Sequence, residues 1–367
     1  MDERAMLSHS FQNTDVTVLL HEVDPVFSSV EEKEKLIQSG THYSRLLSKE
    51  SAPKAAYLKL FDDQVERFGA ELAAHLVSLA GIIASKRRNP VLVSLVRAGT
   101  PIGVVLKRIL NDYGYEAPHF SVSIVRDRGL DMAAIEHILS LGHAAEDIVF
   151  VDGWTGKGVI RNELSRSLRG ADPRFRDIKD ELYVVGDIAG VADYAATRKD
   201  TLIASCLLNA PVSGLISRSV TRDDAGLLQH GAAYLSELAD VDRSLSFVNR
   251  LHVLSHQVML AGSLIEHGHL ALAQANSATD AAELMKALLV RIREQFGITD
   301  NNMIKPGIGE SSRVLLRRVP DRLLVSSLSL PSVQHLIVLA NERSIPVQVV
   351  EDMPISALAI IKDVSHE

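Results

Sequence analysis

The chain has 367 residues, 46% of them apolar and 23% charged, which is typical of a folded globular protein and excludes a disordered or fibrous chain. At about 150 residues per domain, this length predicts two or three domains. A single cysteine excludes an intrachain disulfide and a cysteine-rich zinc site. The acidic first residues differ from a signal peptide, and the longest uncharged stretch, 323–341, is too polar to span a bilayer. We therefore expect a cytoplasmic protein without membrane contact.

Charge is distributed unevenly along the chain. The net charge is −7, but residues 286–322 carry +4 and the remainder carries −11. This asymmetry predicts a separate C-terminal module with a partner of its own, although a solvated helix face would produce the same charge count.

The N-terminal part of the chain predicts an α/β domain. From residue 53 to residue 86, apolar residues recur every three or four positions, as in a helix. Apolar runs then alternate with helical stretches, which predicts a parallel sheet. The expected strands are 16–20, 91–96, 120–125, 147–151, 182–185 and 201–207, and the shorter helices are 31–38, 101–110, 132–141 and 159–168. Ligands bind beyond the carboxyl ends of such strands, so we expect the site in the loops after residues 96, 125, 151 and 185.

The rest of the chain predicts a helical connector and a small α/β module. Residues 221–296 have a mostly helical pattern, which ends in an amphipathic helix with Ser277 as N-cap and Gly297 as C-cap. Strands at 314–319, 323–326 and 347–350 and a helix at 332–342 complete the module. We therefore predict three units: residues 1–220, 221–275 and 276–367.

The strongest local signal is the segment 147–159, in which a buried strand ends in Asp152 and a glycine-rich loop opens a helix. The backbone N–H groups of such a loop can cradle a phosphate, and the acid can hold a sugar hydroxyl. The bland alternative is a tight turn in which Asp152 only caps the helix. Trp154, the single tryptophan, either fills the core or stacks on a ligand.

This segment resembles the phosphoribosyl-diphosphate (PRPP) signature of the type I phosphoribosyltransferases. The resemblance implies that Asp152 contacts the ribose and that the loop residues surround the 5′-phosphate: Gly153, Trp154, Thr155, Gly156, Lys157 and Gly158. The turn Arg97, Ala98 and Gly99 resembles the family's diphosphate loop, and Arg126 and Arg128 lie where its mobile loop is found. Asp152, Arg97 and Arg126 are the implied catalytic residues, and Mg²⁺ is expected on the diphosphate. Gly153 stands where the family usually has a second acid, and Arg97 or Arg126 could instead form surface ion pairs.

The whole arrangement, with residues 40–44, resembles a narrower family, the phosphoribosyltransferase proteins of bacterial tellurite-resistance and stress gene clusters. It implies transfer from PRPP to an unknown, nucleobase-like small-molecule acceptor, or the reverse reaction. The candidate acceptor residues are Asp187, Asn209, Ser213 and Arg218. We also expect a possible homodimer.

The same family is often labelled a cysteine protease (StiP), which gives an alternative function. Its only candidate nucleophile is Cys206, inside the apolar run 202–208. A catalytic cysteine needs an exposed position and a neighbouring histidine. Because Cys206 lies inside an apolar run, it is instead predicted to be a buried strand residue. His252 and His256 have a spacing that suits a metal, but the HExxH pattern is absent, and no metal site is predicted.

Residues 305–313 resemble the GxNExxK segment of the Pelota-like RNA-binding fold. The resemblance implies RNA contacts by Lys305, Glu310 and Arg313, with Arg317 and Arg318 as phosphate contacts. Gly309 replaces the family's asparagine, and a docking module without RNA is the alternative. The predicted fold class is thus α/β: a parallel-sheet type I phosphoribosyltransferase domain, a helical connector and a C-terminal α/β/α Pelota-like domain. An RNA-binding regulator with a nucleotide-sensing site is a third functional hypothesis.

Overall fold

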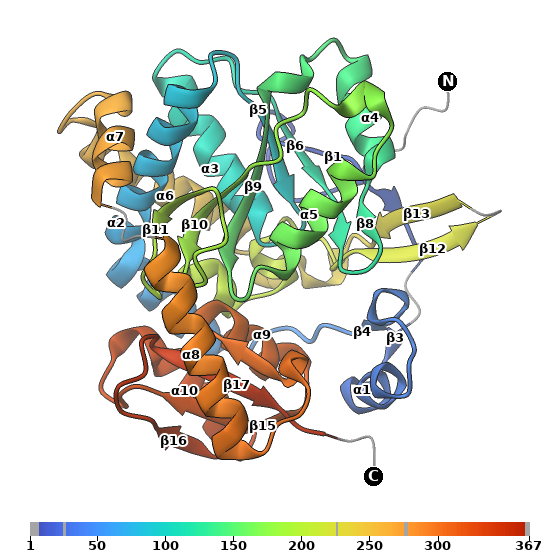
Figure 1. Ribbon diagram of the computed structural model, residues 1–367, viewed down its shortest axis with the longest axis vertical. Coiled ribbons are helices and arrows are strands. Elements are labelled where there is room, and N and C mark those ends of the chain that lie inside the picture. The colour runs from blue at the N-terminus through green and yellow to red at the C-terminus, as the bar shows by residue number, and fades with distance from the viewer. Residues whose placement is uncertain (1–6, 25–26, 225–226, 275–277, 364–367) are drawn as a thin grey trace.

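The computed structural model describes residues 7–24, 27–224, 227–274 and 278–363. Within them, parallel strands form one main sheet in the order β1-β6-β5-β9-β10-β11 (Figure 1). The bounds are β1 (Thr17–Val18), β6 (His119–Val122), β5 (Val91–Leu95), β9 (Ile148–Thr155), β10 (Leu182–Asp187) and β11 (Tyr194–Thr197). The predicted parallel α/β sheet is confirmed.

The strand order reverses between β5 and β9. Counted from β5, the core strands run 2-1-3-4-5, the order of a doubly wound sheet, and ligands bind at the reversal point. This topology brings the carboxyl ends of β5 and β9 together, although Leu95 and Thr155 are 60 positions apart in the chain. The structure therefore places the loops around Arg97 and Asp152 side by side.

Helices cover both faces of this sheet because strand side chains alternate between two cores. Leu92, Val149 and Tyr183 pack with α2 (Ala55–Lys86), α3 (Gly99–Asp112) and α6 (Ser244–Met259). Val93, Phe150 and Val184 pack with α4 (Met132–Ser140) and α5 (Val159–Arg169) on the other face.

α2 is long and apolar enough to cross a membrane by length and composition alone. More than half of its apolar window is buried inside the protein, where it packs against α6 and α7 (Leu264–Gln274). It is therefore the central core helix of this layer.

Two predictions about the middle of the chain are wrong. The predicted strand 201–207 is a 3-10 helix, Ala204–Leu207, and the sheet's edge strand is β11 instead. The predicted helical connector begins with an antiparallel hairpin, β12 (Val220–Asp224) and β13 (Leu227–Ala232), which extends from the body in Figure 1. Its helices α6 and α7 pack on α2 as part of the first core, so they do not form a separate linker. Ser277, the predicted N-cap, lies outside the described residues.

The C-terminal module has a sheet in the order β14-β17-β15-β16 with helices on both faces. α8 (Ala278–Phe296) covers one face, and α9 (Ile308–Arg317) and α10 (Gln334–Glu342) cover the other. The strands are β14 (Ile304–Pro306), β15 (Pro320–Val325), β16 (Val347–Val349) and β17 (Ala357–Ile361). The predicted strand 314–319 is wrong because α9 continues to Arg317. Its buried residues Ile308, Ser311, Ser312 and Leu315 recur at the three- and four-residue spacing of a helix.

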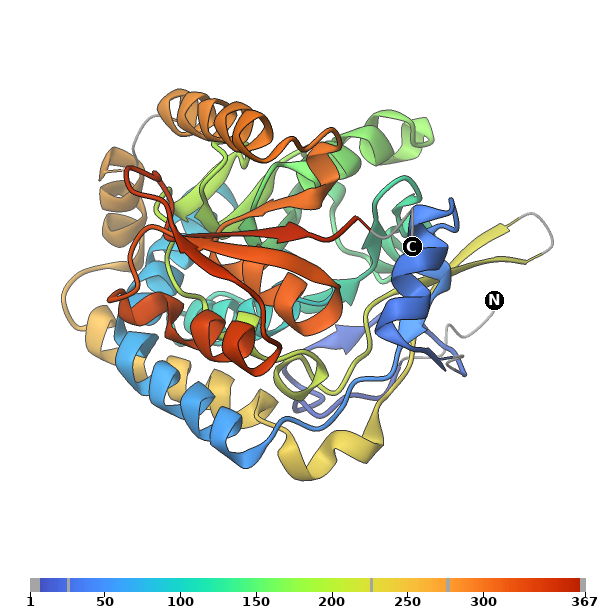
Figure 2. The same cartoon turned by 90° about the horizontal axis from the view of Figure 1, so that it is seen from below.

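The C-terminal module packs against the carboxyl edge of the main sheet (Figures 1 and 2). Asp200 of the first domain accepts hydrogen bonds from the Ile308 amide at the start of α9 (3.0 Å) and from the Ser356 amide (2.9 Å). Glu34 of α1 (Val30–Gln38) pairs with Arg318 at 2.5 and 2.7 Å. The modules therefore share partly buried polar contacts at the edge where a ligand site is expected. The remaining short strands are β2 (His21–Glu22), β3 (Phe27–Ser28), β4 (Leu47–Ser48), β7 (Ile124–Val125) and β8 (Gly129–Leu130).

Candidate functional site

A cavity of about 580 Å³ lies between the glycine-rich loop after β9 and the C-terminal module. It brings together residues that sequence analysis assigned to two separate sites. From the predicted PRPP site come Arg126, Asp152, Trp154, Thr155, Gly156, Lys157 and Gly158, and from the predicted RNA site come Lys305, Glu310, Arg313 and Arg318. The basic C-terminal segment thus faces the first domain, and its positively charged side chains line this cavity.

Asp152 lies at the cavity wall within the extended strand β9 and is 9% exposed. Its Oδ1 accepts a hydrogen bond from the Gly153 amide at 2.7 Å. Burial raises the pKa of Asp152 to about 6, and the nearby Arg313 guanidinium opposes that rise. The side chain therefore titrates near neutrality, as a proton donor or acceptor would.

Trp154 connects the two modules. Its Nε1 donates to Glu310 Oε1 at 3.2 Å, and the guanidinium of Arg313 lies 4.4 Å from the centre of its ring. Arg313 also donates to Glu310 at 2.6 Å. A Cβ at Gly309 would lie 2.4 Å from Trp154 Cε2, so only a glycine lets α9 approach this closely. The residue that departs from the Pelota-like pattern is therefore the one that makes room for the tryptophan.

We expect Gly309→Ala to lower the free energy of unfolding by ~1–3 kcal/mol, because the added methyl group overpacks against Trp154. Urea unfolding followed by the fluorescence of Trp154, the single tryptophan, measures both the stability and the local change. Gly262→Ala is the matched control, since its Cβ would meet its nearest atom at 3.5 Å, an ordinary contact. Equal stabilities and spectra in the two variants would contradict the close approach.

A second cavity of about 180 Å³ lies beside the loop after β5 and is lined by four arginines: Arg97, Arg218, Arg313 and Arg317. Glu50 pairs with Arg97 at 2.6 Å, and Glu310 pairs with Arg313 at the same distance. Asn209 Oδ1 accepts from both Arg97 (3.1 Å) and Arg317. Burial lowers the pKa of Arg218 to about 10 and that of Arg317 well below its usual value. Such desolvated guanidiniums favour an anionic ligand.

Cys206 lies in the wall of this second cavity, on the 3-10 helix, and is 3% exposed. Its Sγ is 3.3 Å from Ser312 Oγ, which in turn is 2.8 Å from His335 Nε2. Burial raises the pKa of the thiol to about 12 and lowers the pKa of His335 to about 3. At neutral pH the resting site therefore contains a thiol and a neutral imidazole.

The other predicted residues have mainly positioning contacts. Fully buried Asp187 accepts bonds from Thr155 Oγ1 (2.5 Å), from Arg198 and from the Ala192 amide (2.8 Å), so it holds the loop. Ser213 Oγ donates to the Asn209 carbonyl at 3.1 Å. Lys157 donates to the Asn301 carbonyl.

The loop arginines and the small residues of the two turns are placed as follows. The Arg126 guanidinium lies 5.5 Å from the Tyr43 ring centre. Arg128 lies in the turn between β7 and β8. Ala98 lines the second cavity, and a Cβ at Gly99 would lie 2.5 Å from the Val151 carbonyl oxygen. The two turns therefore meet at backbone distance.

Sequence reasoning missed Glu50, Ser312 and His335. Glu50 lies in an irregular N-terminal segment, and the other two come from the C-terminal module, more than 100 residues after Cys206. The only signal for the latter pair was the polar residues Ser312 and His335 within apolar, core-forming stretches.

The fold and site define a two-module α/β protein with a cationic cavity that contains its one cysteine. Residues 9–252 match the family described as "Tellurite-like stress resistance cysteine protease StiP", and residues 284–363 match the "PELOTA RNA binding domain". The chain is 38% identical over 370 residues to "Cysteine protease StiP" of Acinetobacter baylyi, covering 97% of this chain and 94% of that protein. The chain belongs to the StiP family.

Similarity to solved structures is weak. An aminotransferase from Thermococcus profundus has a TM-score of 0.19 at 11% identity, with 80% of this chain and 74% of that chain covered. An aspartate aminotransferase from Rhodobacter sphaeroides has a TM-score of 0.22 at 12% identity, with 99% and 90% covered. Scores this low carry no argument about fold or function.

The prediction of a PRPP-dependent glycosyltransferase is contradicted, because the family and the relative are both described as cysteine proteases, which are hydrolases. The physical reason is that a strand-end acid and a glycine-rich turn are general features of doubly wound sheets and do not specify one reaction. Here the loop also packs on the C-terminal module, where a Cβ at Gly156 would lie 2.9 Å from Glu310 Cγ. The Mg²⁺ expected with diphosphate stays a prediction. In the second cavity the described lining residues include no acidic side chain that could bind it.

Proposed function

We propose that this protein is a cysteine hydrolase that cleaves acidic peptides, with Cys206 as the nucleophile. The observation that carries the proposal is the hydrogen-bonded series Cys206–Ser312–His335 in the wall of a cavity. A nucleophile linked to a base within hydrogen-bond reach is the general arrangement of covalent catalysis. Ser312 Oγ donates to the Ile308 carbonyl at 2.8 Å in the resting structure, so a relay requires the hydroxyl to turn toward His335 Nε2, which accepts in the tautomer with its proton on Nδ1.

The raised pKa of Cys206 determines when the thiol loses its proton in the proposed reaction. Because the resting thiol is protonated, its proton must leave during attack on the carbonyl carbon, in the same step as S–C bond formation. The thiol proton would pass to Ser312 while the Ser312 proton passes to His335, whose imidazolium exists only transiently because burial lowers its pKa to about 3. That proton goes to the leaving amine, and water then hydrolyses the Cys206 thioester and restores the thiol. The guanidinium of Arg313 lowers the cost of the developing thiolate, because it acts against the effect of burial.

The four arginines of the second cavity supply the substrate preference. Glu50 and Glu310 pair with Arg97 and Arg313. The remaining positive charge of Arg218 and Arg317 matches carboxylates on a peptide, whereas a basic peptide would be repelled. The family to which the chain belongs supports the reaction class, and the charge of the cavity supports the acidic substrate.

We expect the wild-type protein to hydrolyse a fluorogenic peptide with glutamates around the scissile bond and to leave a lysine-substituted peptide intact. Cys206→Ala and Cys206→Ser should each lower the rate by at least about 100-fold, since each removes the thiol. Ser246→Ala, which changes a hydroxyl on α6, is the control that keeps activity. Hydrolysis by Cys206→Ala at the wild-type rate would contradict the proposal, as would an inactive wild type.

Thiol alkylation measures the resting state independently. With a thiol pKa of about 12, iodoacetamide at pH 7.5 should modify Cys206 about 1,000-fold more slowly than a free thiol of ordinary pKa. The rate should rise about tenfold per pH unit up to that pKa. Labelling in guanidinium chloride gives the unfolded reference rate. Equal rates in the folded and unfolded protein would contradict a buried, protonated thiol.

We further propose that the N-terminal domain has the type I phosphoribosyltransferase topology and uses it as a scaffold for this different chemistry. The 2-1-3-4-5 core order and the position of Asp152 in the carboxyl-terminal half of β9 support this assignment. Superposition of an experimental structure on that fold class would test it.

RNA binding, a homodimer and a cytoplasmic location also stay predictions. The five predicted RNA residues face the first domain, so an RNA segment would have to enter the space between the modules.

A further inference from the structure

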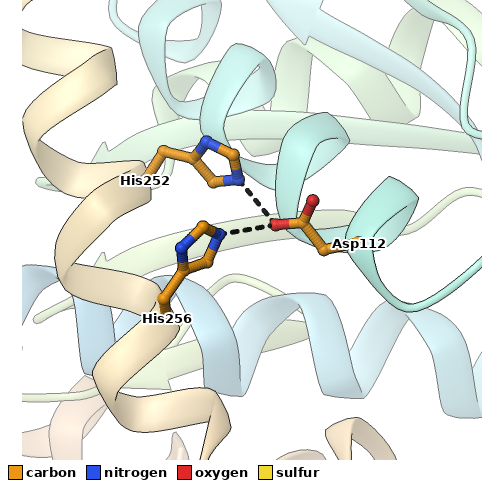
Figure 3. A group of neighbouring side chains, drawn as sticks. All are labelled: Asp112, His252 and His256. Atoms are coloured by element: carbon orange, nitrogen blue, oxygen red, sulfur yellow. Dashed lines mark hydrogen bonds and ion pairs between the residues drawn. The ribbon is translucent and has the colours of Figure 1, made fainter.

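Two histidines and an aspartate converge on the outer side of helices α3 and α6 (Figure 3). His252 and His256 are one helical turn apart on α6, and Asp112 is the last residue of α3. Both Nε2 atoms point to the same carboxylate oxygen, at 2.6 Å for His252 and 3.0 Å for His256. The two rings lie 4.7 Å apart, edge to face. None of the three residues lines either cavity described above.

From this geometry we propose that Asp112, His252 and His256 form a Zn²⁺ site. All three ligand atoms lie within 4.8 Å of one another. In a tetrahedral zinc site with bonds of about 2.0–2.2 Å, neighbouring ligand atoms are about 3.3 Å apart. The Asp112 oxygen, at 2.6 and 3.0 Å from the two imidazole nitrogens, therefore needs to move outward by less than about 1 Å to make room for the ion.

The donor set selects the class of metal. Two imidazole nitrogens and one carboxylate oxygen suit Zn²⁺ and its first-row neighbours, whereas Ca²⁺ and Mg²⁺ prefer oxygen ligands alone. The side chains of His252, Asp112 and His256 are 22%, 34% and 54% exposed. An ion held by three protein ligands at such an open position keeps a coordination place for water.

The site departs from the prediction of no metal, and the reason is topological. The i,i+4 histidines are visible in the sequence, but the third ligand lies 140 residues earlier on a different helix. Bound Zn²⁺ would join α3 to α6 and so stabilise the packing of these helices, because only the folded chain presents all three ligands.

Zinc binding to the EDTA-treated full chain, with Zn²⁺ alone and a chromophoric chelator as competitor, tests the proposal. We expect one high-affinity ion per chain and a rise of several degrees in melting temperature. Asp112→Asn, His252→Gln and His256→Gln should each weaken binding by at least about tenfold, the order seen when a zinc site loses supporting groups. His269→Gln, an exposed histidine on α7, is the matched control with unchanged binding.

Co²⁺ provides a second readout that does not depend on the stability of the variants. Its absorption bands in the wild-type protein should be those of a four-coordinate nitrogen–oxygen site, and they should be lost in His252→Gln. Absence of Zn²⁺ binding by the wild-type protein would overturn the proposal and leave a hydrogen-bonded ion pair. Equal binding by the wild type and all three ligand variants would also overturn it, because the ion would then lie elsewhere.

Discussion

Replacing His335 by glutamine is expected to lower the rate of Cys206-dependent hydrolysis by about 10²–10⁴-fold, the usual contribution of a general base. Glutamine can still accept a hydrogen bond from Ser312, but it cannot take up the proton that the thiol must lose. The side chain is fully buried in the C-terminal module, so the loss would also prove that both modules build one active site. Single-turnover rates with the acidic fluorogenic peptide measure the effect.

The pH dependence of stability gives this prediction a second, independent measurement. Burial lowers the pKa of His335 to about 3, whereas an unfolded histidine titrates near 6.5. The unfolded chain therefore binds a proton that the folded chain refuses. The contribution to stability is fully present above about pH 6.5 and is lost as the pH falls toward 3, by at most ~1.4 kcal/mol per pH unit.

In His335→Gln this part of the acid sensitivity should disappear. Urea unfolding at several values between pH 4 and 7 measures the slope, and His269→Gln is the control because its ring is exposed. A variant that keeps both full activity and the wild-type slope would show that His335 neither accepts the proton nor stays neutral in the folded protein.

Local patterns in the sequence were sufficient for most of the sheet and its helices. The apolar runs at β5, β9 and β10 are continuous because these strands are buried on both faces. Such continuous runs predict a parallel sheet. The run 202–208 is equally apolar, yet it forms a 3-10 helix under the C-terminal module. Apolarity reports burial, and a short buried run does not specify strand or helix.

Only part of the candidate site can be predicted from the sequence, for a related reason. Arg97 follows β5 and Asp152 lies near the carboxyl end of β9, and the topology places these strands side by side, so their proximity could be predicted. The proximity of Cys206 to Ser312 depends on how two modules dock, which is decided by contacts such as Trp154 against Gly309. In the sequence the only signs of those contacts are Gly309, where the Pelota-like segment has an asparagine, and Trp154, the single tryptophan. For the same reason the sequence does not show a histidine near Cys206, because His335 lies in the other module.

Replacing Glu50 by alanine is expected to lower the free energy of unfolding at pH 7 by about 3 kcal/mol, because it leaves buried arginines without their counter-ion. Glu50 accepts from Arg97 at 2.6 Å and from the Ala210 amide at 2.9 Å, and Arg97 is only 7% exposed. Urea unfolding measures the loss. Glu71→Ala on the exposed side of α2, where the side chain is 56% exposed, should change stability by less than about 0.5 kcal/mol.

The pH dependence of this loss identifies its electrostatic origin. Burial alone would raise the pKa of Glu50, but the guanidiniums of Arg97 and Arg317 outweigh burial and hold the pKa below its usual value. Its contribution to stability is therefore present above about pH 4.3, where the unfolded side chain is ionised, and is lost as the pH falls through the folded pKa. The difference between wild type and Glu50→Ala should shrink in that acidic range. A difference that stays constant with pH would assign the loss to packing and would contradict the electrostatic role of Glu50.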